Sequence, residues 1–196
     1  MSPKVIGITG GIGSGKSLIA KVFACLSIPI YEADDRAKQL IKNDPVLKNQ
    51  LLELLGPEAY LPSGEYNRTW VASQIFDKPE LLQQVNERVH PRVRKDGEEW
   101  AQSHASAPYL LYEAAIMKAA GEGNNFQKVI VVEAPLELRI RRVKQRDNRT
   151  EQAIQDIIAR QASEEERQRI ADYIIWNDEK TSVIEQVLNL DEELRK

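Results

Sequence analysis

The residues best suited to chemistry lie near the N-terminus, in a glycine-rich segment that ends with Lys16 and Ser17. From Gly10 the sequence reads Gly-Gly-Ile-Gly-Ser-Gly-Lys-Ser, which satisfies the pattern G-x-x-x-x-G-K-[ST]. Gly10, Gly13 and Gly15 tolerate positive φ and carry no Cβ, so successive N–H groups can face a polyphosphate at a helix N-terminus. Lys16 should reach the β- and γ-phosphates, and the Ser17 hydroxyl should bind Mg²⁺. The pattern predicts a phosphate-binding loop.

A second candidate is the acidic segment 32–35, which follows a short apolar run at 28–31. Open α/β sheets place their ligands beyond the carboxyl ends of strands. Asp34 is the best candidate to orient or deprotonate an acceptor hydroxyl, because a nearby carboxylate can accept the proton as the oxygen attacks. Asp35 and Glu32 are rivals, since Asp34 and Asp35 should point to different sides of an extended chain. The alternative is an acidic helix N-terminus that only stabilises the helix dipole.

A third candidate is the basic run from Arg139 to Arg149, which holds six basic residues and one acid. Arg139, Arg142 and Arg146 have helical spacing, so a single helix face should present three guanidinium groups. Such runs are commonly solvated surfaces. Phosphoryl transfer, however, needs cations at the oxygens of the transferred group, which favours a lid whose Arg142 or Arg146 contacts phosphates.

The histidines and the cysteine carry weaker signals. His90 and His104 have no third ligand at a standard spacing, so they do not form a metal-binding set. Cys25 is the single cysteine, cannot form an internal disulfide, and is expected to fill the core in a reducing compartment.

Length and composition restrict the classes of protein to consider. The chain has 196 residues, with 42% hydrophobic and 29% charged residues and a net charge of −3, as expected for one α/β core with a helical insertion. Without a basic excess, nucleic acid is an improbable partner. No apolar window of membrane-spanning length and no leader-like N-terminus is visible, so we expect no membrane partner and a cytoplasmic location. A monomer or a weak homo-oligomer is expected.

The hydrophobic pattern predicts an α/β fold. Continuous apolar runs indicate parallel strands covered on both faces, at 5–8, 28–31, 109–112, 128–132 and 173–176. Helices are expected elsewhere, at 18–26, 37–43, 45–55, 69–76, 79–100 and 136–146, after Thr150 and Ser163, and from 182. Pro91 should kink or break its helix. Because 36–102 contains no strand-like run, we expect a helical insertion there that receives the second substrate.

Several short motifs occur together and in a characteristic order. They are Thr9 with the glycine-rich loop, Pro29 to Asp34, Tyr66-Asn67-Arg68 with Ile75-Phe76, His90-Pro91, Arg142 to Asp147, Gln161, and Ala171 to Asn177. In this set and order, the chain resembles the dephospho-coenzyme A kinase family over nearly its whole length. The loop alone would indicate only a superfamily.

The resemblance implies ATP-dependent phosphorylation of the ribose 3′-hydroxyl of dephospho-coenzyme A, the last step of coenzyme A synthesis. It also implies a three-layer P-loop kinase fold with a five-stranded parallel sheet, a helical substrate-binding insertion and a helical lid. The corresponding ranges are 1–35 with 106–135 and 171–196 for the nucleotide-binding core, 36–105 for the coenzyme A-binding insertion, and 136–170 for the lid.

The resemblance also assigns roles to residues. Asp34 would be the catalytic aspartate, supported by Lys16 and by the lid residues Arg142 and Arg146, with Ser17 binding the metal ion. Asn177 would border the adenine. The full ATP-binding set would be Gly11, Ile12, Gly13, Ser14, Gly15, Lys16, Ser17, Arg142 and Asn177, and the substrate-binding set Thr9, Asp34, Lys38 and His90.

Three positions depart from the family pattern. Glu32 replaces the first aspartate of a D-A-D segment, and Lys38 replaces an arginine and cannot form its bidentate fork. We favour the register in which a family glutamate falls on Ala119, because it leaves Gly121 in place and Glu113 at the end of the strand; the alternative register, 109–113, matches the glutamate to Glu113. Two other functions therefore remain open: a P-loop kinase of another small alcohol or nucleotide, and an ATP-gated binding module with impaired catalysis.

Overall fold

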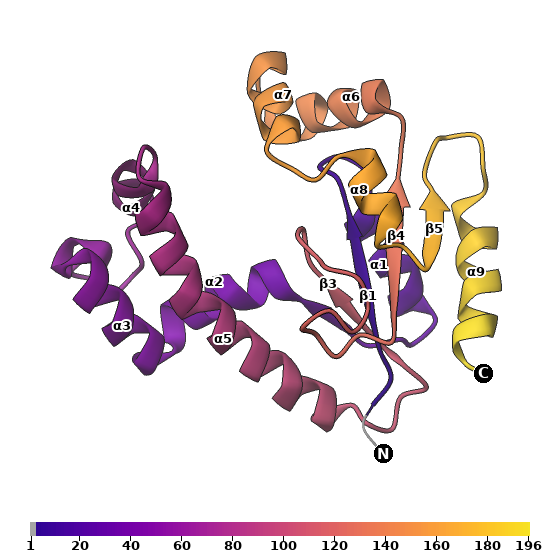
Figure 1. The fold of residues 1–196 in the computed structure, drawn as a ribbon, viewed down its shortest axis with the longest axis horizontal. Helices are drawn as coiled ribbons and strands as arrows, with labels where there is room; N and C mark the ends of the chain where they lie inside the picture. The colour runs from indigo at the N-terminus through magenta and orange to yellow at the C-terminus, as the bar shows by residue number, and fades with distance from the viewer. Residues whose placement is uncertain (1–2) are drawn as a thin grey trace. The chain divides into compact units, whose positions relative to one another are not determined.

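The computed structural model describes residues 3–196 and contains a five-stranded parallel sheet with the order β2-β3-β1-β4-β5 (Figure 1). This confirms the predicted α/β fold. Every pairing between neighbouring strands is parallel. The strands are β1 (Val5–Gly10), β2 (Ile30–Glu32), β3 (Leu110–Glu113), β4 (Lys128–Glu133) and β5 (Tyr173–Trp176).

The described chain divides into two compact units. The core unit consists of the residues up to Glu32 and of Ala101–Lys196, and the helical unit is Ala33–Trp100. The sequence-based division into core, insertion and lid concerns function and stays a prediction. The helices are α1 (Lys16–Cys25), α2 (Ala33–Asn43), α3 (Pro45–Leu55), the 3-10 helix η1 (Pro57–Ala59), α4 (Arg68–Ile75), α5 (Pro79–Ser103), α6 (Leu136–Asp147), α7 (Glu151–Ala159), α8 (Glu164–Arg169) and α9 (Val183–Leu194).

The sheet register brings the carboxyl ends of the strands to one edge. Ile8 of β1 lies opposite Glu113 of β3, and Glu113 lies opposite Glu32 of β2. Gly10 lies opposite Val132. The glycine-rich loop therefore leaves β1 at the edge where the acidic ends of β2, β3 and β4 arrive, the position at which open α/β sheets bind ligands.

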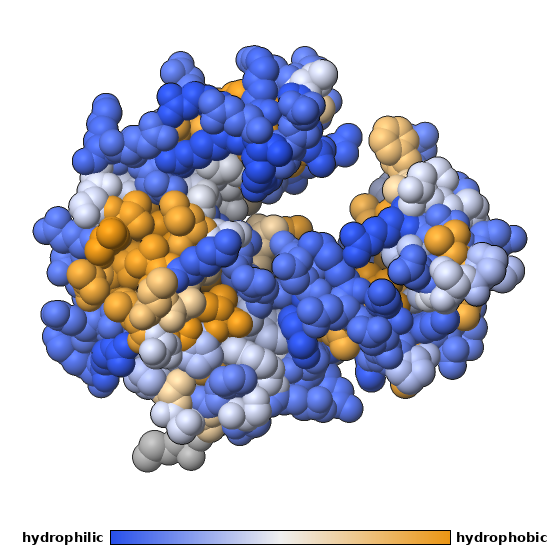
Figure 2. All heavy atoms as spheres, turned by 180° about the vertical axis from the view of Figure 1, so that it is seen from behind, coloured by the Kyte–Doolittle hydropathy of each residue, from blue (hydrophilic) through white to orange (hydrophobic). Residues whose placement is uncertain are grey.

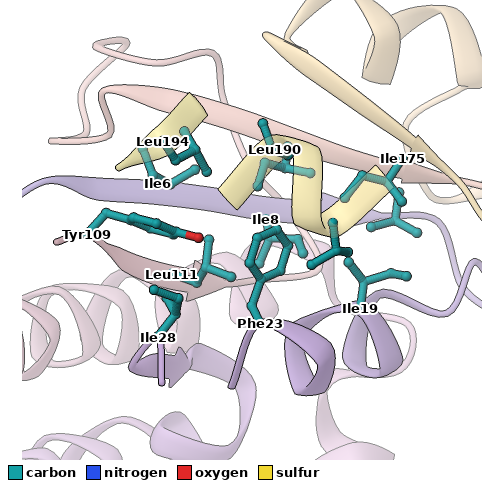
Figure 3. Packing of buried hydrophobic residues seen from close by; sticks show 13 residues of the cluster. Ile6, Ile8, Ile19, Phe23, Ile28, Tyr109, Leu111, Ile175, Leu190 and Leu194 are labelled. Carbon is teal, nitrogen blue, oxygen red and sulfur yellow. The ribbon is translucent and has the colours of Figure 1, made fainter. Parts of the chain in front are cut away.

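One face of the sheet packs on α1 and α9 (Figure 3). Figure 3 shows Ile19 and Phe23 of α1 close to Ile8 of β1, with Leu190 of α9 in the same cluster. These side chains are nearly all fully buried, and each such burial stabilises the fold by about 1.5–3 kcal/mol. Gly7 faces the other side of the pleat. A Cβ at Gly7 would collide with Met117, so the glycine allows the segment after β3 to lie against β1.

Some apolar side chains of the core unit stay exposed. From behind, Figure 2 shows hydrophobic residues gathered over the region of α1, β5 and α9. The exposed apolar side chains of β5 and α9 are Ile174, Trp176, Ile184 and Leu188. Within residues 3–196, no helix has both the length and the apolar character needed to cross a bilayer.

A helix cap and charged pairs link the helices of the helical unit. Asp44 caps α3 through the Val46 and Leu47 amides and forms an ion pair with Arg92 of α5. Arg36 of α2 donates two hydrogen bonds to Asp96 of α5. A bidentate arginine–carboxylate pair restricts geometry more than a single contact does, so α2 and α5 are held in one orientation.

Two local expectations are corrected by the structure. Of the two effects expected of Pro91, a break was wrong, because α5 continues through it with Val85, Val89 and Val93 buried at four-residue spacing; a kink stays a prediction. Packing of that face outweighs the cost of about 3 kcal/mol for an internal proline. Cys25 is exposed rather than in the core. It follows the buried Phe23 by two residues, which places it on nearly the opposite side of α1.

Tyr109, just before β3, tests how much a buried hydrogen bond stabilises the core unit. Its hydroxyl donates to the buried carboxylate of Asp191, and burial followed by this hydrogen bond raises the pKa of Tyr109. We expect Tyr109→Phe to lower the free energy of unfolding by about 2 kcal/mol, since a hydrogen bond to a charged group typically contributes that much. Urea unfolding followed by circular dichroism measures the loss.

Tyr173→Phe is the matched control. The Tyr173 hydroxyl also donates to a carboxylate, that of Glu193, but at an exposed position. Its loss should cost less than about 1 kcal/mol, because water replaces the lost partner. Equal losses in the two variants would contradict the assignment of a special stabilising role to the buried pair.

Candidate functional site

The glycine-rich loop has the backbone geometry that its sequence predicts. Gly13 and Gly15 have φ of 78° and 92°, in the left-handed region, and Gly15 is the N-cap of α1. Gly10 is required for a different reason, since a Cβ there would lie 2.5 Å from the Val132 carbonyl oxygen. The loop thus turns sharply into α1, whose N-terminal amides and dipole favour an anion.

Lys16 and Ser17, at the start of α1, both contact Glu113 at the end of β3. The Lys16 Nζ atom lies 3.0 Å from Glu113 Oε1, and the Ser17 hydroxyl donates to the same oxygen at 2.8 Å. Glu113 is only 6% exposed. The sequence correctly placed Glu113 at the end of its strand but did not reveal these contacts. Together the Ser17 hydroxyl and the Glu113 carboxylate form the hard oxygen set that Mg²⁺ prefers.

Ile12 lies in the middle of the loop, and both its backbone amide and its backbone carbonyl form hydrogen bonds with side chains. Gln161 Oε1 accepts from the Ile12 amide at 2.8 Å, and Arg139 Nε donates to the Ile12 carbonyl at 2.9 Å. Arg139 comes from α6 and Gln161 from the turn between α7 and α8, so two separate parts of residues 136–170 contact the loop. Gln161 was part of the sequence resemblance, but neither contact was predicted.

Arg139 was expected on the same helix face as Arg142 and Arg146, but it lies elsewhere. It is 5% exposed, it adjoins Gly11, and its Nη2 has no hydrogen-bond partner within residues 3–196. Burial, followed by the nearby Arg167, lowers its pKa. The prediction of one helix face presenting three arginines was therefore wrong, because Arg139 turns inward to the loop.

Arg142 and Arg146 have separate partners. Arg142 donates to the Asn177 carbonyl at 3.0 Å and to the Asn177 side-chain oxygen at 3.3 Å, and lies 3.4 Å from Glu179. The Arg146 side chain is 65% exposed and pairs with Asp147. Their proposed contacts with phosphates stay predictions.

Asn177, predicted to border adenine, contacts the loop itself. Its side-chain amide donates to the Ser14 carbonyl at 2.8 Å, and a Cβ at Gly15 would collide with that amide. The Asn177 backbone amide donates to the carbonyl of Glu133 at 2.8 Å. A buried bidentate pair of Glu133 with Arg167, at 2.7 and 2.9 Å, lies at this end of β4 and was not predicted. The loop therefore rests on a rigid polar support.

The residues expected to bind the acceptor occupy both units. Thr9 is buried in β1, and its hydroxyl lies 3.4 Å from the Ala115 carbonyl oxygen. His90 is exposed on α5, and Lys38 is exposed on α2, where it pairs with Asp35. Their roles in substrate binding stay predictions.

Asp34 lies in the first turn of α2 and is exposed. The expected extended chain at Asp34 and Asp35 was wrong, because the helix begins at Ala33, four residues earlier than predicted. The acidic residues thus also stabilise the helix N-terminus. This does not exclude chemistry, since Asp34 follows Glu32, the last residue of β2, by only two positions.

Comparisons with known proteins identify the family of this chain. A family model described as "Dephospho-CoA kinase" matches residues 4–182. A dephospho-CoA kinase of Bacteroides fragilis is 35% identical over 94% of this chain and 90% of its own length. A crystal structure of a Thermus thermophilus protein superimposes with a TM-score of 0.85 and 30% identity over 98% of each chain. A dephospho-CoA kinase structure from Campylobacter jejuni, at 21% identity, shares the fold with a TM-score of 0.63 over 99% of this chain and 98% of its own.

Gln161 can be tested as a positioning residue of the loop. We expect Gln161→Ala to speed hydrogen exchange at the Ile12 amide about fivefold, since the lost hydrogen bond contributes about 1 kcal/mol. Gln161→Glu keeps an acceptor oxygen and should retain most of the protection. Amide exchange measured by NMR or mass spectrometry checks both variants.

The control for this experiment is Gln145→Ala, an exposed glutamine on α6. Its removal should leave exchange at Ile12 unchanged. If Gln161→Ala and Gln145→Ala behave alike, Gln161 does not hold the loop.

Proposed function

The chain belongs to the dephospho-CoA kinase family, and we propose that it transfers the γ-phosphoryl group of ATP to the ribose 3′-hydroxyl of dephospho-coenzyme A. The products are coenzyme A and ADP. The observation that carries the proposal is the phosphate-binding loop with Lys16, Ser17 and Glu113 converging at its end.

The loop fits a triphosphate with Mg²⁺. The left-handed backbone of Gly13 and Gly15 forms the turn into α1, and the N-terminus of α1 supplies amides. Ser17 and Glu113 would hold the metal ion, which when bound neutralises charge on the phosphate oxygens. Lys16 would turn from Glu113 to the β- and γ-phosphates, and the remaining ATP contacts would come from residues 11–15, Arg142 and Asn177.

In the proposed reaction the ribose 3′-oxygen attacks the γ-phosphorus as Asp34 accepts the hydroxyl proton. The bond from the γ-phosphorus to the bridging oxygen breaks, and ADP leaves. Lys16, Arg142 and Arg146 would stabilise the negative charge on the oxygens of the transferred group. Thr9, Lys38 and His90 would position the acceptor.

The proposed division of labour follows the sequence-based ranges. Residues 1–35, 106–135 and 171–196 would bind the nucleotide, 36–105 would bind the acceptor, and 136–170 would close over both as a lid. The contacts of Arg139 and Gln161 with Ile12 support this scheme, because they couple the lid to the loop. Closure would exclude water that otherwise hydrolyses ATP. The two substrates are the partners we propose, for a monomer or a weak homo-oligomer.

The function is tested by incubating the purified protein with ATP, Mg²⁺ and a panel of acceptors. We expect coenzyme A and ADP to form in equal amounts with dephospho-coenzyme A, detected by chromatography. ATP binding without product would instead favour a catalytically impaired binding module. A higher kcat/KM with a nucleotide or a sugar than with dephospho-coenzyme A would show that the proposed acceptor is wrong.

The proposed role of Asp34 as proton acceptor is tested by comparing variants of Asp34 and Asp35. We expect Asp34→Asn to lower kcat at least about 10²-fold, because the amide cannot accept the hydroxyl proton. Asp35→Asn should lower it less than about fivefold, since an exposed pair such as Asp35 with Lys38 contributes little. Steady-state kinetics with circular dichroism as a folding control measures both variants. A larger loss of kcat in Asp35→Asn than in Asp34→Asn would assign the role of proton acceptor to Asp35.

A further inference from the structure

Arg139 is a buried cation whose charge the folded protein does not balance. It is 5% exposed and, within residues 3–196, forms no ion pair with a carboxylate. Glu133 and Glu164 act on it only at a distance. Both oxygens of Glu133 accept from Arg167, at 2.7 and 2.9 Å, and Glu164 is exposed to water. Two buried guanidinium groups therefore share one buried carboxylate, which leaves one positive charge in excess.

This excess charge lies against the phosphate-binding loop. Arg139 Nε donates to the Ile12 carbonyl, and a Cβ at Gly11 would collide with the guanidinium group. A Cβ at Gly13 would lie 2.5 Å from the Arg139 carbonyl oxygen. Gly11 does not have a positive φ, so its backbone does not require glycine. The small residue is needed there because it makes room for Arg139.

Two buried polar atoms without a hydrogen-bond partner lie at this loop in the described chain. They are Arg139 Nη2 and the hydroxyl oxygen of Ser14, a loop residue that is 0% exposed. Native proteins rarely leave such atoms unpaired, and an unpaired buried charge is especially costly. The loop and its arginine are therefore built at a cost to stability, which is typical of a site arranged for a ligand.

A polyphosphate in the loop would supply the missing negative charge. Because Nη2 is buried, Arg139 would not touch the ligand and would act through the loop that it contacts. Charges separated by protein atoms interact more strongly than charges separated by water. Lys16 differs from Arg139 in this respect, because it already has Glu113 as its partner.

We propose that Arg139 is a positioning residue for the triphosphate, and that its buried charge favours a ligand in proportion to the negative charge that the ligand brings to the loop. The inference rests on the proposed function only in taking the loop to be the ATP site. Arg139 has two effects, its charge and its hydrogen bond to Ile12, and the experiment must separate them.

The first test compares Arg139→Gln with Arg139→Lys. Both side chains are shorter than arginine and can donate a hydrogen bond, but only lysine keeps the charge. We expect Arg139→Gln to weaken ATP binding about tenfold, ADP binding about threefold and adenosine binding not at all, because the lost interaction is with phosphate charge. Arg139→Lys should stay within about threefold of the wild type for all three. Calorimetric titration with Mg²⁺ measures ATP and ADP, and competition against ADP measures adenosine.

Two matched controls accompany this comparison. Gln161→Ala removes the other side-chain contact of Ile12 without removing a charge, so its losses for ATP and ADP should be equal. Arg169→Gln removes a positive charge from an exposed side chain of α8 in the same unit and should leave all three affinities unchanged.

The second test uses stability, where a merely structural arginine would give the opposite result. Without nucleotide, Arg139→Met should unfold at a urea concentration no lower than the wild type, because it removes an unpaired buried charge. Arg167→Met should unfold at a clearly lower concentration, because it leaves Glu133 buried without its partner. ATP should raise the unfolding midpoint of Arg139→Met less than that of the wild type.

Three results would overturn the inference. They are equal losses in the glutamine and lysine variants, losses that do not depend on the number of phosphates, and a large loss of stability in Arg139→Met. A wild-type protein that binds ATP but forms no coenzyme A would contradict the proposed function and leave this inference standing. An active wild-type enzyme whose Arg139→Gln variant keeps its ATP affinity would do the reverse.

Discussion

The buried carboxylate of Glu113 is the interaction on which the candidate site depends. A charge with so little exposure must be paired, and Lys16 and Ser17 are its partners in this structure. The same three groups are those that would meet the terminal phosphates and a metal ion. If Lys16 turned toward a triphosphate alone, Glu113 would face like charge. The proposed function therefore requires the nucleotide to enter together with a divalent cation, which would give Glu113 a new partner.

The loop itself is supported mainly by side chains distant in sequence. The Asn177 side chain donates to the Ser14 carbonyl. Arg139 donates to the Ile12 carbonyl, and Gln161 accepts from the Ile12 amide. These contacts join the loop after β1 to the segment beyond β5, to α6 and to the turn between α7 and α8. A change in the loop when phosphates enter would be transmitted through Arg139 to α6, the helix that also carries Arg142 and Arg146. These contacts thus pre-organise the base of the candidate site.

Local patterns were sufficient to predict the loop and all five strands, because glycine spacing and continuous apolar runs are encoded in adjacent residues. The start of α2 was missed because Ala33 to Asp35 continues an acidic segment that is equally compatible with a turn. Arg139 was misplaced for another reason: helical spacing shows which residues share a face but not what that face meets. The pair of Glu133 with Arg167 joins residues 34 positions apart, and no local signal links them. Contacts between residues far apart in the sequence could be identified only from the structure.

The charged pairs of this protein fall into two groups with different consequences. Glu133 with Arg167 is nearly inaccessible, and breaking one partner of such a pair costs about 3–5 kcal/mol, so it serves as a fixed support. The pairs of Arg146 with Asp147, Lys38 with Asp35, and Lys42 with Glu65 are exposed and weak. Cations in weak pairs can be transferred to a ligand at little cost. Arg146, which we propose to contact phosphates, is in this weakly paired group, whereas Arg142 would first have to leave its hydrogen bonds to Asn177.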